Sequence, residues 1–431
     1  MKTISTKDKN FQSVIRSIAE RGRQLNTAVE PLVHDIITQV RVHGDTALLR
    51  LTKKYEGHTK ITVAPNMLKQ ARKKLKKNIY DALELAYRRI TVFHRRQLQN
   101  SWLQTGSEGE ILGQLVRPLE RVGIYVPGGK AVYPSSVLMN AIPAIVAGVK
   151  EIIMVTPGSS RGIEPVILAA AEMCGISKVF QIGGAQAIAA LAYGTAKVPR
   201  VDKIVGPGNI YVATAKKLVF GDVAIDMIAG PSEILILSDG SGNPAWAAAD
   251  MLSQAEHDEM ASALLITTDA AFARKVVREL QHQLVRLPKK GIAALSLQRY
   301  GAIITARDLH EAAGIANAIA PEHLELFVQD PWKLLPEIDN AGAVFLGYST
   351  PEAVGDYIAG PNHVLPTGGS ARFFSLLSVD DFLKKTSIVF FPHQAACAIG
   401  RHAAVLARAE ELVAHARSVD MRLASEKKPQ K

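Results

Sequence analysis

A glutamate and a histidine stand side by side in this sequence, as Glu322 and His323, directly after Pro321. An imidazole titrates near neutral pH and a neighbouring carboxylate can activate water, so the pair could perform acid–base chemistry. The alternative is a surface charge pair. Pro321 places the dipeptide in a turn, and the alternating apolar residues over 324–328 predict that a strand follows. We therefore expect the pair at the entrance of a strand.

Two further groups of polar residues flank this pair in the sequence. Gln254 and His257 stand three positions apart at the end of a predicted helix, which would put both side chains on one helical face. An imidazole with an amide or carboxylate oxygen suits zinc, although such a histidine is more often a hydrogen-bonded structural residue. Residues 355–363, GDYIAGPNH, are expected in a loop. Spacing alone therefore leaves a metal site open.

Three glycine-rich turns each follow a β-like run and open a helix, at 125–129 (YVPGG), 183–186 (GGAQ) and 206–209 (GPGN). Backbone N–H groups at such helix starts could hold a pyrophosphate, although each turn alone could be only a tight turn. None is GxGxxG, so the ordinary dinucleotide fingerprint is missing. Three such turns together favour a nucleotide site.

The elements that must position these residues alternate between β-rich and helical runs from Val122 onward. One series extends to about residue 219, and a second extends from 234 to about 346. This alternation predicts an α/β fold with two Rossmann-like domains and mainly parallel sheets, in which ligands bind beyond the carboxyl ends of the strands. A mainly helical stretch to about 105 precedes them, and an Ala-rich helix over 394–417 follows.

Length and composition are typical of a multi-domain globular protein. The 431 residues suggest about three domains, and 48% hydrophobic with 21% charged residues excludes general disorder. No stretch approaches the roughly 18 apolar residues of a membrane helix, and the N-terminus lacks the apolar core of a signal peptide. The two cysteines, Cys174 and Cys397, lie far apart, which argues against a disulfide framework or thiolate zinc site. We therefore expect a cytoplasmic protein.

The net charge of +11 is concentrated in the first 100 residues, which hold 21 Lys and Arg against 8 Asp and Glu. Such an excess could bind nucleic acid. Over 68–93, however, apolar residues recur at steps of three and four, which predicts one long amphipathic helix with the lysines of 69–77 on its solvent side. A solvated helix face is the favoured interpretation. A nucleic-acid or membrane-surface role is the alternative, and no named nucleic-acid motif supports it.

Eight blocks of this sequence, in the same order, closely resemble those of the histidinol dehydrogenase family. The resemblance extends from about residue 20 to 424. The blocks are GIYVPGG at 123–129, GGAQAIAAL at 183–191, GPGN at 206–209, AGPSE at 229–233, LSQAEHD at 252–258, APEHLEL at 320–326, GDYIAGPNHVLPTGG at 355–369 and AHAR at 414–417. Chance agreement over eight ordered blocks is negligible.

The resemblance implies a cytoplasmic, zinc-containing homodimer that oxidises L-histidinol to L-histidine with two NAD. The reaction passes through L-histidinal held on the enzyme and forms the last steps of histidine biosynthesis. The implied acid–base residues are Glu322 and His323, and the implied zinc ligands are Gln254, His257, Asp356 and His415. The implied substrate contacts are Ser232, Gln254, His257, His323, Asp356, Glu410 and His415. The implied NAD contacts are Tyr125, Gln186 and Asn209.

The same resemblance suggests how the chain is divided. A helical arm over 1–22 is followed by a discontinuous α/β domain over 23–122 and 234–377, which carries the zinc and acid–base residues. The α/β domain that binds NAD would span 123–233. The small helical segment over 378–431 would support dimerisation and carry His415 and Glu410 into the partner's active site.

The implied chemistry agrees with the residue types. Oxidising an alcohol to an acid needs a base for the hydroxyl proton, then water added to the aldehyde, and His323 and Glu322 suit these roles respectively. Zinc would act as a template that grips the substrate.

Two alternatives remain open. A same-fold relative acting on another polar alcohol, such as a sulfonated diol, would keep the zinc and the Glu-His pair but change the substrate anchors. A basic nucleic-acid-binding protein on an inactive enzyme fold is disfavoured, because every implied catalytic and zinc position holds the expected residue type. The basic N-terminal region is not explained by the resemblance.

Overall fold

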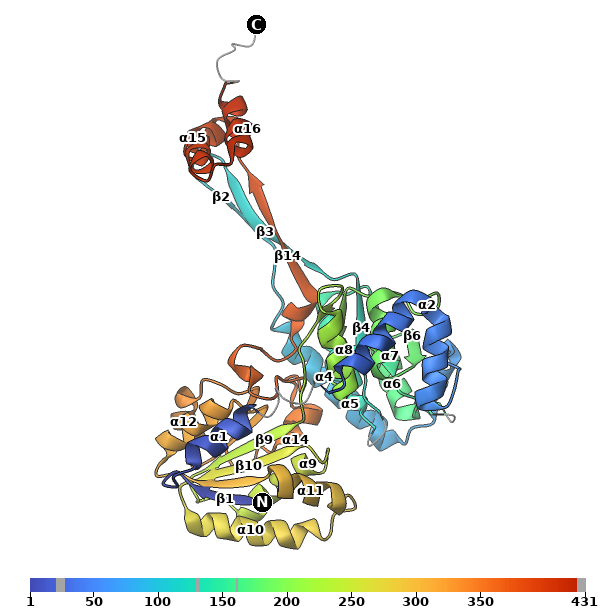
Figure 1. Cartoon of the computed structure of the whole chain (residues 1–431), viewed down its shortest axis with the longest axis vertical. Helices are drawn as coiled ribbons and strands as arrows, with labels where there is room; N and C mark the ends of the chain where they lie inside the picture. The colour runs from blue at the N-terminus through green and yellow to red at the C-terminus, as the bar shows by residue number, and fades with distance from the viewer. Residues whose placement is uncertain (21–27, 129–131, 160–161, 425–431) are drawn as a thin grey trace. The chain divides into compact units, whose positions relative to one another are not determined.

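The computed structural model describes residues 1–20, 28–128, 132–159 and 162–424. The chain forms two compact units, one of residues 1–98 and 119–382 and the other of residues 99–118 and 383–431. The first unit contains two parallel sheets covered by helices (Figure 1). The predicted α/β fold with two mainly parallel sheets is thus confirmed.

One parallel sheet has five strands, in the order β6-β5-β4-β7-β8. Its strands are β4 (Arg121–Tyr125), β5 (Glu151–Thr156), β6 (Lys178–Gln181), β7 (Lys203–Val205) and β8 (Ala224–Ile225). Its connecting helices are α5 (Pro134–Ala147), α6 (Pro165–Met173), α7 (Gly184–Tyr193) and α8 (Ile210–Val219). The strand order reverses between β4 and β7, and such a switch point is where open α/β sheets bind ligands.

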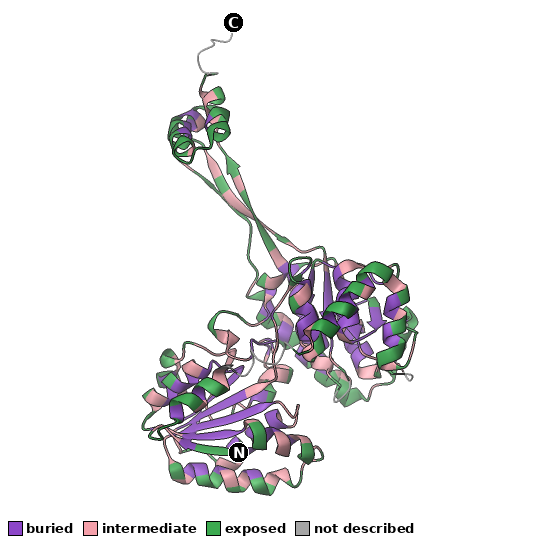
Figure 2. Cartoon of the chain, viewed as in Figure 1, coloured by how far each residue is buried: buried purple, intermediate pink, exposed green. Residues whose placement is uncertain are grey.

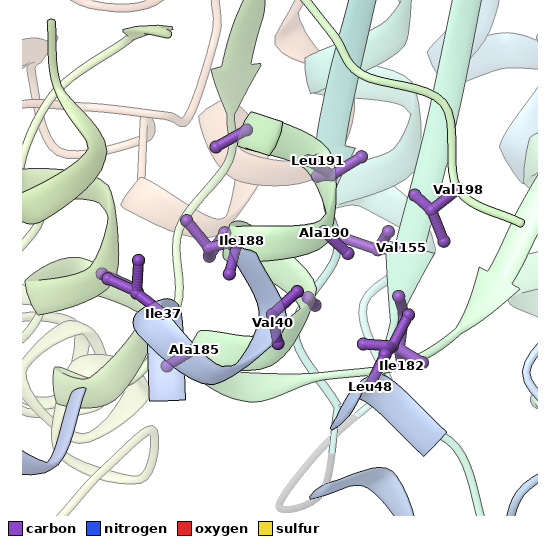
Figure 3. Close-up of a cluster of buried hydrophobic side chains, with 14 of the residues drawn as sticks. Ile37, Val40, Leu48, Val155, Ile182, Ala185, Ile188, Ala190, Leu191 and Val198 are labelled. Carbon is purple, nitrogen blue, oxygen red and sulfur yellow. The ribbon is translucent and has the colours of Figure 1, made fainter. Parts of the chain in front are cut away.

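Helix α2 (Glu30–Glu56) packs against the helices of the five-stranded sheet, α7 above all. Its buried side chains, such as Ile37 and Val40, contact a cluster that includes Ile188 and Leu191 (Figure 3). Helix α7 is rich in alanine, and these small side chains allow the two helices to approach closely. These contacts join residues 30–56 to the five-stranded sheet, whereas the predicted division groups them with residues 234–377. The division of the chain into domains remains a prediction.

The other parallel sheet has six strands, in the order β1-β11-β10-β9-β12-β13. Its strands are β1 (Lys2–Ser5), β9 (Glu233–Ser238), β10 (Ser262–Thr267), β11 (Ala302–Thr305), β12 (His323–Phe327) and β13 (Ala343–Leu346). Its longer helices are α1 (Phe11–Glu20), α9 (Pro244–Ala255), α10 (Ala270–Leu284), α11 (Lys290–Tyr300) and α12 (Leu309–Ile319). Strands β9, β10 and β12 are buried almost throughout (Figure 2), because helices lie on both faces.

Short elements complete the first unit. They are α13 (Pro331–Leu334), η2 (Leu335–Glu337), α14 (Glu352–Val354), η3 (Gly355–Ala359), η4 (Ser370–Arg372) and η5 (Val379–Phe382). The segment η3 is π-helical, a rare conformation that is frequent at functional sites. The expected loop at 355–363 is therefore partly helical.

The second unit joins two distant parts of the chain in an antiparallel sheet. Strand β3 (Ile111–Pro118) pairs with β2 (Trp102–Thr105) on one side and β14 (Leu383–Phe390) on the other. Two helices, α15 (His393–Ala409) and α16 (Val413–Ala424), pack together in the same unit. This small antiparallel sheet was not predicted from the sequence.

Two predicted long helices are each broken into two. The stripe over 68–93 belongs to α3 (Pro65–Lys73) and α4 (Lys77–Arg95), because Lys76 is extended and the helices pack on different partners, α6 and α5. The Ala-rich C-terminal helix ends at Ala409, where Glu411 takes a positive φ of 61°. The helical spacing of apolar residues continues across both breaks, but the backbone leaves the helical conformation there. Among the described residues, none of the helices has the length and apolarity to cross a membrane.

The lysines around the α3–α4 junction are exposed, as expected for a solvated face. Replacing Lys73, Lys74 and Lys77 together by glutamate should leave the urea midpoint of unfolding unchanged, because these side chains lie away from the core. Retention of DNA or RNA by the unaltered protein should not exceed that of a generic basic protein at matched salt. Stronger retention that disappears in the variant would contradict a purely solvated face.

Candidate active site

The Glu322-His323 pair lies at the amino end of β12, one of the central strands of the six-stranded sheet. Both residues are buried, with exposed fractions of 7% and 3%. Burial excludes an exposed charge pair. Buried charged groups need partners, so the surroundings of the pair decide what it can do.

The backbone of Glu233, at the start of β9, holds both members of the pair. Its N–H donates to Glu322 Oε2 at 2.9 Å, and its carbonyl oxygen lies 3.0 Å from His323 Nδ1. A carbonyl can only accept, so Nδ1 carries a hydrogen and Nε2 is the nitrogen that can take up a proton. Nε2 is buried and finds no hydrogen-bond partner among the described residues, with Asp356 Oδ1 3.3 Å away. His323 is thus oriented as a base.

Three carboxylates surround the His323 imidazole. Glu322 and Glu352 lie 3.7 and 3.8 Å from Nδ1, and Asp356 faces Nε2. Burial by itself lowers the pKa of His323, but the three carboxylates together raise it well above the ordinary value. Burial raises the pKa of Glu322 to about 8, against the opposing charge of His323. Glu322 can therefore exchange a proton near neutral pH, whereas the surrounding carboxylates favour the protonated form of the His323 imidazole.

Gln254 and His257 reach the same edge of the sheet because α9 runs antiparallel to β9. Gln254 is fully buried, and in the amide orientation that satisfies both of its ends the nitrogen donates to the two Glu352 oxygens at 2.6 and 3.1 Å, with the amide oxygen on the opposite side. His257 lies beyond the end of α9, with its N–H bonded to the Gln254 carbonyl. The shared face of the two side chains remains a prediction, because His257 lies just past the last residue of α9. Burial lowers its pKa, which favours the neutral imidazole that metals bind.

These groups fit a metal ion. The donor atoms of His323, Glu352 and Asp356 lie within 4.8 Å of one another. Asp356 interacts electrostatically with His257 as well as with His323. With the amide oxygen of Gln254, the cluster offers the nitrogen and oxygen donors that zinc takes. Gln254, His257 and Asp356 are thus brought to one edge of the sheet.

The other expected substrate and metal residues are Ser232, Glu410 and His415. Ser232 directly precedes β9, at the same sheet edge as the acid–base pair. Glu410 and His415 belong to the second unit, where both are exposed, after α15 and within α16. Their roles remain predictions.

The expected NAD residues lie at the carboxyl ends of the five-stranded sheet. Tyr125 ends β4, and Asn209 follows β7 and caps α8 by accepting from the N–H groups of Tyr211 and Val212. These two strands flank the switch point of the sheet. Gly206 has a φ of 112°, and a side chain there would meet the Tyr125 carbonyl at 2.2 Å. The turn after β7 therefore comes close to β4, in a position that suits a dinucleotide.

The turn at 183–186 is closed by an internal carboxylate. The N–H groups of Gly183 and Gly158 donate to the two oxygens of Glu56, at 2.9 and 3.1 Å, and the Gln186 amide lies 3.3 Å from the same carboxylate. The next N–H, of Gly184, donates to the Tyr125 hydroxyl at 3.1 Å. The donors expected to hold a pyrophosphate at this turn are thus already used. Nothing in the sequence around Glu56 signals this role.

Comparison with known proteins decides the family. The histidinol dehydrogenase family model matches residues 19–423. The chain belongs to the histidinol dehydrogenase family. The histidinol dehydrogenase of Geobacter sulfurreducens is 55% identical over 428 residues, covering 98% of this chain and 100% of the relative. That of Aquifex aeolicus is 52% identical over 412 residues, covering 94% and 95%.

A solved structure agrees with this assignment. The crystal structure of histidinol dehydrogenase from Elizabethkingia anophelis superposes with a TM-score of 0.93 at 36% identity, covering 99% of each chain. The resemblance seen in the sequence is therefore confirmed, and the chain has the same fold as this solved structure.

Sequence reasoning missed two groups of this histidinol dehydrogenase family site. Glu352 precedes Asp356 by four residues, a spacing that puts two acidic side chains on one helical face and could have drawn attention. The contribution of Glu233 comes from its backbone, so no side-chain pattern could reveal it.

Removal of the Glu56 carboxylate should destabilise the protein. Glu56→Ala leaves the Gly158 and Gly183 N–H groups without their partner, which should lower the free energy of unfolding by about 1–3 kcal/mol. Asp35→Ala, on an exposed face of the same helix, is the control and should have little effect. Equal urea midpoints for Glu56→Ala and Asp35→Ala would show that the closed turn adds no stability.

The metal-free protein should lose stability as the pH rises. Glu322 keeps its proton in the folded state up to a pKa of about 8, whereas its ordinary value is 4.5. Over that window the folded state binds more protons than the unfolded state, so the free energy of unfolding falls with rising pH. Glu322→Gln should flatten the fall, measured by urea unfolding with a chelator present. Parallel pH profiles for the two proteins would refute the raised pKa.

Proposed function

We propose that this chain is a zinc- and NAD-dependent enzyme that oxidises L-histidinol to L-histidine through L-histidinal, in the last steps of histidine biosynthesis. The observation that carries the proposal is the buried Glu322-His323 pair placed beside Gln254 and Asp356. Family membership supports the substrate, since relatives at 50–55% identity bear the name histidinol dehydrogenase.

His323 would act as the general base of the first oxidation. Its Nδ1 is fixed by the Glu233 carbonyl, so Nε2 would take the proton of the substrate hydroxyl. At the same time, hydride would leave the carbon that bears this hydroxyl. When bound, zinc supplies an anchor for the substrate's imidazole and amine, and NAD accepts the hydride. Gln254, His257, Asp356 and His415 would hold the metal, and Ser232 and Glu410 would also contact the substrate.

Glu322 would serve the second oxidation by activating water. Its carboxyl group is buried against the Glu233 N–H, and its raised pKa of about 8 makes it a stronger base than an exposed glutamate. Water added to the aldehyde gives a hydrate, and His323 can again accept a hydroxyl proton as the second hydride leaves. One site thereby performs both oxidations.

NAD binding is proposed at the carboxyl edge of the five-stranded sheet, in the domain over 123–233. Tyr125, Gln186 and Asn209 would contact the coenzyme, with the turn at 206–209 closest to the switch point. The Glu56 carboxylate occupies the helix start at 183–186, so the coenzyme phosphates would bind elsewhere. This agrees with the missing GxGxxG.

A homodimer with shared active sites is part of the proposal. The second unit exposes apolar side chains on its helices, including Val405, Leu406 and Val413. A small unit with such a surface gains stability when a partner covers it. His415 and Glu410 would then complete the partner's site. Cytoplasmic location is supported by Cys174 and Cys397, which are buried and form no disulfide.

One assay separates this substrate from another polar alcohol. Purified protein with zinc and NAD is offered histidinol, histidinal and unrelated polar alcohols while NADH is followed. The proposal predicts turnover of histidinol with two NADH formed per molecule, and turnover of histidinal with one. Preference for another alcohol would refute histidinol as the substrate.

Substitutions at the acid–base pair should affect the two oxidations differently. His323→Ala should reduce both, by roughly 10²- to 10⁴-fold, because each needs the base. Glu322→Gln should chiefly impair oxidation of histidinal, since water activation belongs to the second step. If Glu322→Gln loses rate equally in the oxidation of histidinol to the aldehyde and of the aldehyde to the acid, the division of roles is disproved. Circular dichroism checks that the variant is folded.

Two inactive variants should restore activity when they share a dimer. A His415→Ala chain refolded with a His257→Ala chain can form one site with an intact His257 from one subunit and an intact His415 from the other. The second site then lacks both. Partial recovery of histidinol turnover is expected, and its absence at every mixing ratio would count against shared sites.

A further inference from the structure

Glu352 is a buried carboxylate to which the proposed mechanism gives no task. It lies on α14 with 3% of its surface exposed, and its backbone N–H donates to Glu325 Oε1 at 2.8 Å. Its own side chain points toward the acid–base site, since Oε1 lies 3.8 Å from His323 Nδ1. A charge buried this deeply requires a compensating contact.

The main contact of this carboxylate is the Gln254 amide. The amide nitrogen donates to Glu352 Oε1 at 2.6 Å and to Oε2 at 3.1 Å. A carboxylate only accepts hydrogen bonds, so it fixes which end of the amide faces it. The Gln254 oxygen must then point the other way.

This orientation matters because only the oxygen of an amide binds a metal ion. The two orientations of a glutamine amide have almost the same shape, so packing alone selects between them poorly. An outer carboxylate that bonds to a ligand fixes its orientation and raises its affinity for the metal. Glu352 is placed to do this for Gln254.

We infer that Glu352 is a positioning residue, which turns the Gln254 amide oxygen toward the metal. The inference rests on the proposed function, in which Gln254 is a zinc ligand. The competing assignment makes Glu352 itself a ligand together with His323 and Asp356, whose donor atoms lie within 4.8 Å of its own. The bonds of both Glu352 oxygens to one amide favour positioning.

Exchanging the side chains of residues 254 and 352 tests the inference. In Glu352→Gln, the new amide can donate to the Gln254 oxygen and turn it away from the metal, which should weaken zinc binding about 10- to 100-fold. Combining it with Gln254→Glu reverses the polarity of the pair. The amide at 352 then donates to a carboxylate at 254, which keeps an oxygen for the metal, so zinc affinity should return to within about tenfold of the unaltered protein.

The measurement is the zinc dissociation constant of the full-length protein, by competition with a chromophoric chelator. Cobalt substitution adds a second readout, because loss of the amide ligand shifts the visible absorption of the bound ion. Glu337→Gln, an exchange at an exposed carboxylate, is the control and should bind zinc as the unaltered protein does.

Two results would overturn the inference. One is unaltered zinc affinity and an unaltered cobalt spectrum in Glu352→Gln. The other is a double variant that binds zinc more than 100-fold more weakly than the unaltered protein, which would make Glu352 a ligand. The double variant keeps the charge and the hydrogen bond, so it decides the question even if Glu352→Gln does not fold. An unaltered protein that binds no zinc would instead refute the proposed function.

Discussion

The peptide groups at Glu233 hold the site together. The N–H donates to Glu322 and the carbonyl accepts from His323, so one residue of β9 fixes both members of the acid–base pair. This depends on the parallel register that places His323 opposite Ile234. A shift of one residue would turn alternate side chains of β12 to the other face and separate the pair from these bonds. The chemistry thus depends on how β9 pairs with β12.

Burial shifts the pKa values of the groups in this arrangement. An imidazole and three carboxylates placed together in a largely buried environment cannot all hold their ordinary charges, so burial raises the pKa values of Glu322 and Glu352 while the carboxylates raise that of His323. Such a cluster costs free energy unless its charges are compensated. A cation bound by Asp356, His257 and Gln254 would compensate the negative charge, which gives a physical reason for a metal ion at this position.

The sequence predicted the two parallel sheets well, because βαβ units have a recognisable pattern of alternating β-rich and helical runs separated by turn residues. It also predicted Glu322 and His323 at the entrance of a strand. Ligands of parallel sheets usually bind at the carboxyl ends of the strands. This pair instead lies at the amino edge of the six-stranded sheet, where the end of α9 places Gln254. Tyr125 and Asn209, the proposed NAD contacts, do lie at the carboxyl ends of strands in the other sheet. Backbone contacts such as those of Glu233, and a distant carboxylate such as Glu56, leave no pattern in the sequence.

The metal centre is the central claim, and zinc content tests it most directly. The unaltered protein and His257→Ala would be purified identically, dialysed against zinc and then against metal-free buffer, and analysed by elemental analysis beside circular dichroism. We expect about one zinc per chain in the unaltered protein and almost none in a folded His257→Ala. Full zinc in the variant, or none in the unaltered protein, would contradict it.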